Sequence, residues 1–533
     1  MKFDELLSNY LGDFGSYQKR VYLLVCLPAI WCSMNMFCWT FTSAEIKHRC
    51  KLSNASWDMA NASFDKSCHR LQQTAPGVLN FTGCTDGYEW DNSDIPSSAL
   101  QEWELVCDRK WIKALTQSLV YVGIFFGSLV LGFLSDKFGR KVVVLVGTFL
   151  ISLASTLCVL SPNVEVFAAL RFVQGFLEPS VWQIPFVIGV ELVGPSKRLA
   201  AGMYIEFFFT AGLVLLGSLA YFVRDWKMLQ VLVSAPGFLF VSYYWILPES
   251  PRWLLAKGRK AEALAVMRRA AVVNKVTVPD EVFDNLDAEE EVKASAECEY
   301  SYLDLFRTSN LRRKTLICCY IWTCVTLIYY GISLNPSAIG GDFYGSFILS
   351  GLVEFPALIF LLLTLNKLGR KGIQAGGLFV SGLALFLIVA LPKGTDLLVV
   401  CLVMVAKLTM TSVFAVVYLH TSEIFPTVIR GIAMGLTVTC SRIGGIISPL
   451  AAMYLEHSEA YRDTTLICFG VLSVISALLT LSLPETTFKK LPETLEDGEL
   501  FGKDVSWCGL SSAGSSVVEF QKEFGAVLDD EET

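Results

Sequence analysis

Long apolar segments are the feature that most constrains this chain. Of its 533 residues, 53% are hydrophobic and only 17% are charged, which is more apolar surface than a soluble domain of this length can bury. A segment of about 20 apolar residues is long enough to cross a bilayer as a helix. Six such segments lie in the first half and six in the second, at 21–41, 115–134, 142–160, 166–190, 199–222, 226–247, 314–334, 343–365, 372–391, 397–419, 431–454 and 464–483. The fourth contains Pro179 and Pro185 and is expected to bend. The sequence therefore predicts an all-α membrane protein with twelve transmembrane helices.

A motif between two apolar segments of the first half returns in the second half. Residues 132–141 read GFLSDKFGRK, and residues 366–371 read NKLGRK. Further landmarks recur in the same order: Glu191 and Arg198 are matched by Glu423 and Arg430, and Pro248–Arg252 is matched by Pro484–Thr486. Transporters are often built from two repeats that rock about a binding site at their interface. The repetition therefore predicts two six-helix bundles and a mechanism based on their relative motion.

Basic residues indicate the orientation in the membrane. Lys and Arg gather in the loops that share one side if the segments alternate, and by the positive-inside rule that side is the cytosol. The segment between the repeats begins as a basic helix that is expected to tie the bundles together, and the polar C-terminal tail is expected to be disordered. The predicted divisions are a cytosolic N-terminus (1–20), an N-terminal bundle (21–247) with an extracellular loop (45–113), a cytosolic linker with helices (248–313), a C-terminal bundle (314–483) and a disordered cytosolic tail (484–533).

The loop at 45–113 has the features of an extracellular segment. Three glycosylation sequons begin at Asn54, Asn61 and Asn80, in agreement with the charge rule. The loop also holds Cys50, Cys68, Cys84 and Cys107, and an even number of cysteines in an oxidising compartment predicts two disulfides. Four cysteines allow three pairings, among which spacing alone does not choose.

The repeated motif is expected to control the conformation of the bundles. Gly139 permits a tight turn, while the Asp136 carboxylate can cap a helix N-terminus and pair with Arg140 beside Lys141. Such a cluster can steady an outward-open state. The alternative is that these basic residues only follow the topology rule, especially in the second copy, where Asn366 replaces the aspartate. Two ion pairs that part as the cavity opens are also predicted, Glu191 with Arg198 and Glu423 with Arg430.

Catalytic and cofactor motifs are missing from the sequence. There is no Walker A sequence, dinucleotide fingerprint or cluster of metal-ligand residues, and the chain has only four His. We therefore expect no enzyme activity, no cofactor, no metal site and no nucleic-acid partner.

Four segments together are specific for one family of membrane proteins. They read EWELVC at 102–107, LSDKFGRK at 134–141, ILPESPRWL at 246–254 and EIFPTVIR at 423–430. With these segments and the glycosylated loop, the chain resembles the solute carrier 22 family of organic ion transporters, within the major facilitator superfamily, over nearly its full length. Sugar porters are similar around 248–254 but lack so large a glycosylated loop. The resemblance implies the major facilitator fold, with twelve helices in two repeats, in the plasma membrane.

The resemblance also implies a disulfide pairing. Family members usually have six loop cysteines, whereas this chain has four, and by position the pairs are Cys50 with Cys84 and Cys68 with Cys107. The third bridge of the family is absent.

Charged residues inside the apolar segments are candidates for the substrate path. Each costs roughly 2.5 to 3.5 kcal/mol on insertion scales and so needs a partner or a wet cavity. The second half offers Glu354, Lys407 and Arg442, and the first half offers Glu178 and Glu206. The resemblance implies that Glu354 and Arg442 face the substrate. For Lys407, a buried structural pair is an equally open alternative.

Arg442 discriminates most between substrates. In family members that prefer simple cations the matching position is acidic, whereas anion and carnitine transporters resemble this chain in having arginine. A zwitterion reconciles Arg442 with Glu354, because its ammonium can meet the carboxylate and aromatic faces while its carboxylate meets the guanidinium. The resemblance also implies that Trp182 and Tyr329 line the cavity.

The sequence thus predicts a facilitator of small charged organic molecules, of the carnitine type, in the lipid bilayer. An organic anion exchanger, in which Arg442 and Lys407 together bind a carboxylate, is one alternative, and a ligand-sensing receptor without transport is another. The substrate gradient, the membrane potential and sodium remain open as driving forces.

Overall fold

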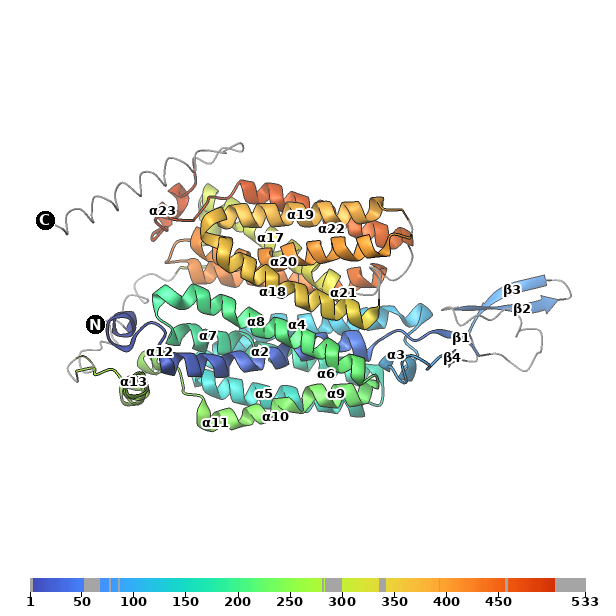
Figure 1. The fold of residues 1–533 in the computed structure, drawn as a ribbon, viewed down its shortest axis with the longest axis horizontal. Helices are drawn as coiled ribbons and strands as arrows, with labels where there is room; N and C mark the ends of the chain where they lie inside the picture. The colour runs from blue at the N-terminus through green and yellow to red at the C-terminus, as the bar shows by residue number, and fades with distance from the viewer. Residues whose placement is uncertain are drawn as a thin grey trace.

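Two helical bundles lie side by side in the computed structural model of this chain (Figure 1). The structure describes residues 3–51, 68–75, 78–84, 87–279, 282, 300–334, 342–392, 394–455 and 459–503. Large apolar side chains such as Phe133, Phe222 and Leu363 are exposed on the outside of the bundles, as expected for surfaces that face lipid.

The N-terminal bundle contains the first six predicted transmembrane segments. The fourth segment is broken, as Pro179 and Pro185 predict: a helix ends at Leu177, a short 3₁₀ turn spans Glu178–Ser180, and a second helix begins at Gln183. The helices are α2 (Ser16–Thr42), α4 (Trp111–Phe138), α5 (Arg140–Leu157), α6 (Val164–Leu177), α7 (Gln183–Leu192), α8 (Arg198–Phe222), α9 (Trp226–Ser234), α10 (Pro236–Leu239) and α11 (Tyr243–Ile246).

The C-terminal bundle contains the other six segments, each as one continuous helix. They are α17 (Ser309–Ser333), α18 (Phe343–Leu368), α19 (Arg370–Ala390), α20 (Asp396–Ile424), α21 (Arg430–Leu455) and α22 (Glu459–Leu481). Within the described ranges, eleven helical stretches are long and apolar enough to cross a membrane, and the broken fourth segment supplies the remaining crossing. The prediction of twelve spans in two repeats is confirmed.

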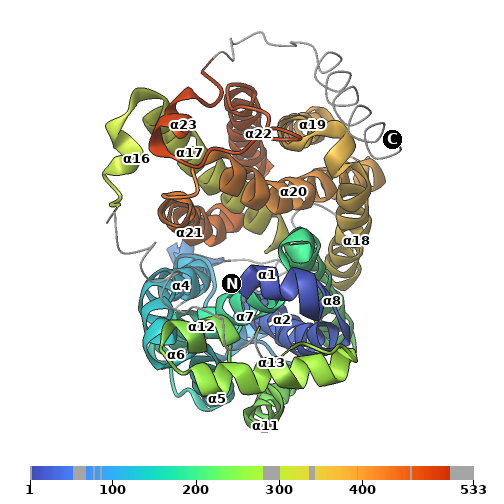
Figure 2. The ribbon, with the colours of Figure 1, turned by 90° about the vertical axis from the view of Figure 1, so that its left-hand side faces the viewer.

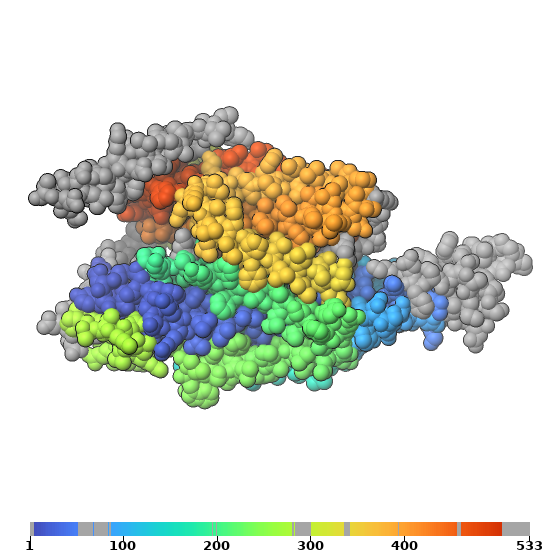
Figure 3. Space-filling view, in the orientation of Figure 1, coloured from blue at the N-terminus to red at the C-terminus, as the bar shows by residue number. Residues whose placement is uncertain are grey.

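Two helix pairs join the bundles, α4 with α21 and α8 with α18. Figure 3 shows the second of these seams, where the green α8 meets the yellow α18. Near the end that carries the 45–113 loop, rings from both bundles form one buried cluster, in which Phe41 of α2 contacts Tyr344 and Phe347 of α18. This aromatic cluster packs the two bundles together at that end.

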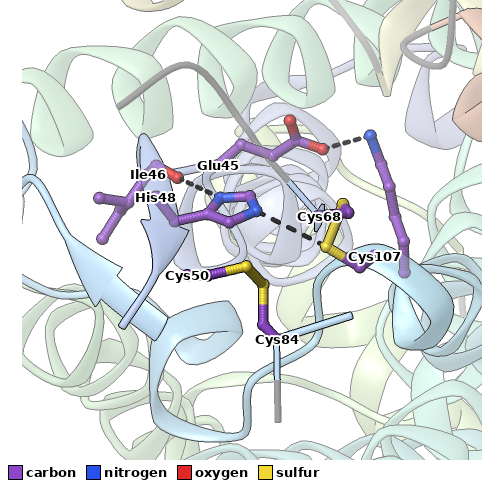
Figure 4. The surroundings of a disulfide bond; sticks show 8 residues. Glu45, Ile46, His48, Cys50, Cys68, Cys84 and Cys107 are labelled. Carbon is purple, nitrogen blue, oxygen red and sulfur yellow. Dashed lines mark hydrogen bonds and ion pairs between the residues drawn. A yellow bond between two sulfur atoms is a disulfide. The ribbon is translucent and has the colours of Figure 1, made fainter. Parts of the chain in front are cut away.

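The loop at 45–113 is held by both disulfides that the resemblance implied, Cys50–Cys84 and Cys68–Cys107. Two hairpins form there: β1 (His48–Cys50) pairs with β4 (Tyr88–Trp90), and β2 (His69–Ala75) pairs with β3 (Val78–Gly83). Figure 4 shows the buried His48 ring beside the second disulfide, with its Nε2 atom 3.9 Å from Cys107 Sγ. Of the sequons, Asn54 and Asn61 lie outside the described residues, and Asn80 lies on β3.

The short helices at the end of the molecule opposite this loop attach to one bundle each (Figure 2). α1 (Phe3–Leu6), α12 (Pro251–Ala256) and α13 (Lys260–Asn274) pack on the N-terminal bundle, where Tyr17 N donates to Asn274 Oδ1 over 2.8 Å. The sequence predicts that this linker helix ties the two bundles together. Its described contacts are instead with N-terminal elements, because its buried alanines meet the apolar side chains before α2. Two further short helices are α3 (Ala99–Glu102) and α16 (Asp304–Arg307).

Part of the C-terminal tail is folded, which corrects the prediction of disorder from 484 onward. α23 (Leu495–Leu500) covers the N-terminal end of α17, where Glu499 accepts hydrogen bonds from the backbone N–H groups of Asn310 and Leu311. Lys314 Nζ donates to the carbonyl of Gly498 over 2.9 Å. The prediction missed α23 because its stability comes from capping α17 and not from an apolar period of its own. Residues 504–533 lie outside the described part of the chain.

Candidate functional site

A cavity lies between the two bundles, about midway along the transmembrane helices. It has an empty volume of about 690 Å³. We call it the central cavity, and both repeats contribute to its lining. The lining residues are Met36, Glu178, Trp182, Glu206, Phe209 and Thr210 from the first repeat, and Tyr329, Tyr330, Glu354, Leu358, Thr411, Phe414, Ala415, Tyr418 and Arg442 from the second. A chamber at the interface of two repeats is where a transporter of this architecture binds its substrate.

Glu354 is fully engaged by the protein. Its carboxylate lies 2.8 Å from Lys407 Nζ and accepts hydrogen bonds from the hydroxyls of Tyr329 (2.7 Å) and Thr210 (2.9 Å). The side chains of Glu354 and Lys407 are only 2% and 1% exposed. Since Thr210 belongs to the other bundle, this buried network also joins the two repeats.

Lys407 lies behind Glu354 and does not line the central cavity. Its ammonium group also donates to Ser333 Oγ and lies 3.5 Å from the centre of the Tyr329 ring. The structure therefore favours the structural alternative for Lys407 that the sequence left open. Lys407, which the sequence offers as a substrate-binding residue, is the ion-pair partner of Glu354, another predicted substrate-binding residue.

Three other charged side chains line the central cavity and are only partly buried: Glu178, Glu206 and Arg442. Glu178 is within electrostatic reach of Arg442 and accepts a hydrogen bond from Cys32 Sγ over 3.3 Å. Among the described residues, no hydrogen bond or ion pair within 4 Å engages the Arg442 guanidinium, and its Nε atom is buried without a partner. The cavity therefore presents an unengaged guanidinium to whatever enters it.

Aromatic rings complete the walls. The Trp182 and Phe209 rings meet edge to face with 5.1 Å between centroids, and the Tyr329 and Phe414 rings are 5.3 Å apart. Ring faces attract organic cations, most strongly where water is excluded. The site thus combines cation-binding surfaces with both signs of charge.

Four of the predicted substrate residues therefore share one cavity: Trp182, Tyr329, Glu354 and Arg442. Sequence reasoning did not assign Phe209 or Thr210. The sequence contains a pattern that could have identified them. Phe209 and Thr210 follow Glu206 by three and four residues on α8, and therefore lie on the same face of the helix.

The repeated motifs form two matching clusters at the end of the bundles opposite the 45–113 loop. In the first, Arg140 Nη1 lies 2.7 Å from Glu191 Oε2, which also accepts a hydrogen bond from Ser250 Oγ. Glu249 accepts from the backbone N–H groups of Arg140 and Lys141, each over 3.2 Å, and so caps α5. Burial raises the pKa of Glu249, and these backbone hydrogen bonds oppose that shift. We call Arg140, Glu191, Glu249 and Ser250 the N-terminal latch.

The second cluster repeats the first residue by residue. Arg370 lies 3.1 Å from Glu423, Thr486 donates to Glu423, and Glu485 accepts from the backbone N–H groups of Arg370 and Lys371 over 3.1 Å. We call Arg370, Glu423, Glu485 and Thr486 the C-terminal latch.

A glycine precedes the arginine of each latch. Gly139 and Gly369 have positive φ values of 107° and 76°. A Cβ atom at either position would approach the capping carboxylate, Glu249 or Glu485, to 2.5 Å. Only glycine fits both the backbone conformation and this close approach.

The predicted partners of the latch carboxylates were wrong. Glu191 and Glu423 pair with Arg140 and Arg370, not with Arg198 and Arg430. A helix break at 193–197 separates Glu191 from Arg198, whose Nε donates to the Val193 carbonyl, while Arg430 donates to Thr427. The capping role expected of Asp136 belongs to Glu249, and Asp136 is 72% exposed at 3.6 Å from Arg140.

Removing one latch arginine is expected to destabilise the protein. Arg140→Met and Arg370→Met each leave a carboxylate that is at most 15% exposed without its ion-pair partner. Breaking such a pair on one side costs about 3 kcal/mol. Thermal denaturation of the detergent-purified protein should show a lower melting temperature for both variants. The exposed Lys137→Met and Lys367→Met remove the same charge beside each latch and should melt like wild type; equal melting of all four variants would contradict the role of the latches.

Metal-ligand residues meet at one place in the described ranges, His48 with Cys68 and Cys107. The two sulfurs are joined in a disulfide and are therefore not available as thiolate ligands.

Comparisons with known proteins agree with this architecture. The family model "Sugar (and other) transporter" matches residues 52–497. The chain is 37% identical to the organic cation transporter protein of Drosophila melanogaster, with 94% of this chain and 95% of that protein aligned. It is 33% identical to organic cation/carnitine transporter 2 of Homo sapiens, over 93% of both chains, and 32% identical to solute carrier family 22 member 3 of Mus musculus, over 95% and 97%.

Solved structures support the fold. The xylose transporter XylE from E. coli, in a partially occluded inward-open conformation, superimposes with a TM-score of 0.62 at 16% identity, covering 89% of this chain and all of that one. Its inward-open conformation gives a TM-score of 0.61 at 17% identity, with 91% and 100% covered. At these identities the likeness concerns the fold alone.

Proposed function

This chain belongs to the solute carrier 22 family within the major facilitator superfamily, and on that premise we propose that it carries small organic cations and zwitterions across the plasma membrane by alternating access. The observation that supports this most is the central cavity, where partly buried carboxylates, an unengaged guanidinium and aromatic faces meet between two repeats.

The chemistry of the cavity matches the substrates in the names of its relatives. One of those relatives is called an organic cation transporter protein and another an organic cation/carnitine transporter. In this chain, an ammonium group can lie against Trp182, Phe209 and a carboxylate, while a substrate carboxylate can bind Arg442. A carnitine-like zwitterion can make both of these contacts at the same time.

Alternating access follows from how the bundles are joined. The aromatic cluster around Phe41 and Tyr344 closes the extracellular side, so substrate entry from outside requires these rings to separate. Each latch lies wholly within one bundle, so we propose that the latches keep the bundles rigid as α4 and α8 move against α21 and α18. The basic loops and the sequons support cytosolic termini in the plasma membrane.

The Lys407–Glu354 ion pair weakens the case for an organic anion exchanger. It required Lys407 and Arg442 together to bind a carboxylate, but the Lys407 ammonium is neutralised by Glu354 at 2.8 Å. A single arginine then faces two partly buried carboxylates, which disfavours a substrate that is only anionic.

Uptake by proteoliposomes of purified protein tests the proposal. We expect saturable uptake of radiolabelled carnitine and tetraethylammonium and none of para-aminohippurate, measured with and without sodium to identify the driving force. Uptake of para-aminohippurate alone would favour the anion exchanger. Bound ligand without net flux would favour a receptor.

A further inference from the structure

The charges of the central cavity do not balance. Glu354 and Lys407 neutralise each other out of solvent, at 2% and 1% exposure. The charges that remain accessible are those of Glu178, Glu206 and Arg442, two carboxylates and one guanidinium. Acidic side chains therefore outnumber basic ones on the accessible surface, which favours a positively charged substrate group.

Glu354 is a poor candidate for binding that positive group. A cation would have to compete with the Lys407 ammonium at 2.8 Å and with the hydroxyls of Tyr329 and Thr210, which between them engage both carboxylate oxygens. Breaking a buried ion pair on one side is strongly unfavourable. The substrate therefore needs another acidic group.

Glu178 is compensated in part by the protein. The Arg442 guanidinium is near enough to stabilise its negative charge, and Cys32 donates a hydrogen bond to its Oε1 atom. Glu206 differs: among the described residues, no hydrogen bond or ion pair engages its carboxylate, and the cavity charge that acts on it is the like charge of Glu354. An ionised carboxylate in such surroundings is stabilised most by a cation that enters the cavity.

We propose that Glu206 binds the cationic group of the substrate, with the aromatic pair Trp182 and Phe209 beside it. Phe209 follows Glu206 by three residues on α8, so the carboxylate and the ring project from the same helical face, and the Trp182 ring packs 5.1 Å from that of Phe209. Carboxylate and ring faces together suit a quaternary or tertiary ammonium group. This inference rests on the proposed function and specifies the recognition site within it.

If Glu206 binds the cationic group, simple cations and zwitterions need different sets of cavity residues. A simple organic cation needs Glu206 and the rings but not Arg442. A zwitterion needs Glu206 for its ammonium and Arg442 for its carboxylate. Loss of Glu206 should therefore impair both classes, which distinguishes it from loss of Arg442.

The test measures uptake of tetraethylammonium and carnitine by wild type, Glu206→Gln and Glu206→Asp, normalised to surface abundance. For E206Q we expect KM to rise about 10- to 100-fold for both substrates, the range for losing one charge-assisted contact. E206D keeps the charge and should show a smaller rise. Glu165→Gln, at an exposed position of α6, is the matched control and should behave like wild type.

The outcomes separate this inference from the proposed function. Wild-type uptake of both substrates, together with an unchanged KM in E206Q, would overturn the role of Glu206 and leave the transport function standing. Absence of uptake by wild type would overturn both. If E206Q does not reach the surface, equal KM values for E206D and wild type would count against the inference, because a shortened carboxylate cannot keep the same contact.

Discussion

Lys407→Met is expected to leave little folded protein in the membrane. The change removes the ammonium group 2.8 Å from Glu354 and leaves that carboxylate, at 2% exposure, uncompensated in the middle of the bilayer. Breaking a buried ion pair on one side costs about 3 to 5 kcal/mol, a large part of the stability of a typical domain. Fluorescence-detected size-exclusion chromatography of a tagged protein should show a strongly reduced monodisperse peak.

A second change should rescue this variant. In Lys407→Met/Glu354→Gln both charges are absent, and replacing a buried pair by neutral groups is often close to neutral for stability. The double variant should therefore recover most of the peak, and Glu354→Gln alone, which leaves a buried ammonium, should resemble Lys407→Met. Recovery that does not exceed the single variants would mean that the two groups stabilise the fold independently.

Arg442→Gln is expected to separate zwitterions from cations. The variant loses the guanidinium that we propose binds a substrate carboxylate, so carnitine uptake should fall about 100-fold, as expected for one strong charge-assisted contact. Tetraethylammonium uptake should persist with an equal or lower KM, because removing a positive charge makes the cavity more attractive to cations. Arg442→Asp should show the same trend more strongly.

The control for Arg442 is Arg20→Gln, which removes the same group from an exposed position on α2. Uptake is measured at equal surface abundance. Parallel loss of carnitine and tetraethylammonium uptake in Arg442→Gln would indicate a structural role of Arg442, since a role in substrate recognition requires the two substrates to respond differently.

Much of the architecture could be predicted because it depends on local patterns. Apolar length predicted the spans, Pro179 and Pro185 predicted the break in the fourth, and the resemblance supplied the disulfide pairs that the structure contains. Trp182 and Arg442, named from the resemblance, do line one cavity.

The partners of charged residues could not be predicted from the sequence. Lys407 and Glu354 lie on different helices, and only the packing of α20 against α18 brings them together. In the same way, Glu191 pairs with Arg140, 51 residues away in the chain, and not with the closer Arg198. Sequence spacing identifies which charges are buried in a bundle, but three-dimensional packing decides which of them remain available to a ligand.

The separate attachment of α13 and α23 allows the motion of the halves to be followed by spectroscopy. Asn274 fixes α13 to the start of α2, and Glu499 fixes α23 to the start of α17, so each short helix reports on a different half. A donor dye on one and an acceptor dye on the other, both at the same end of the molecule (Figure 1), would convert each transport cycle into a change in energy-transfer efficiency, without a label in the central cavity.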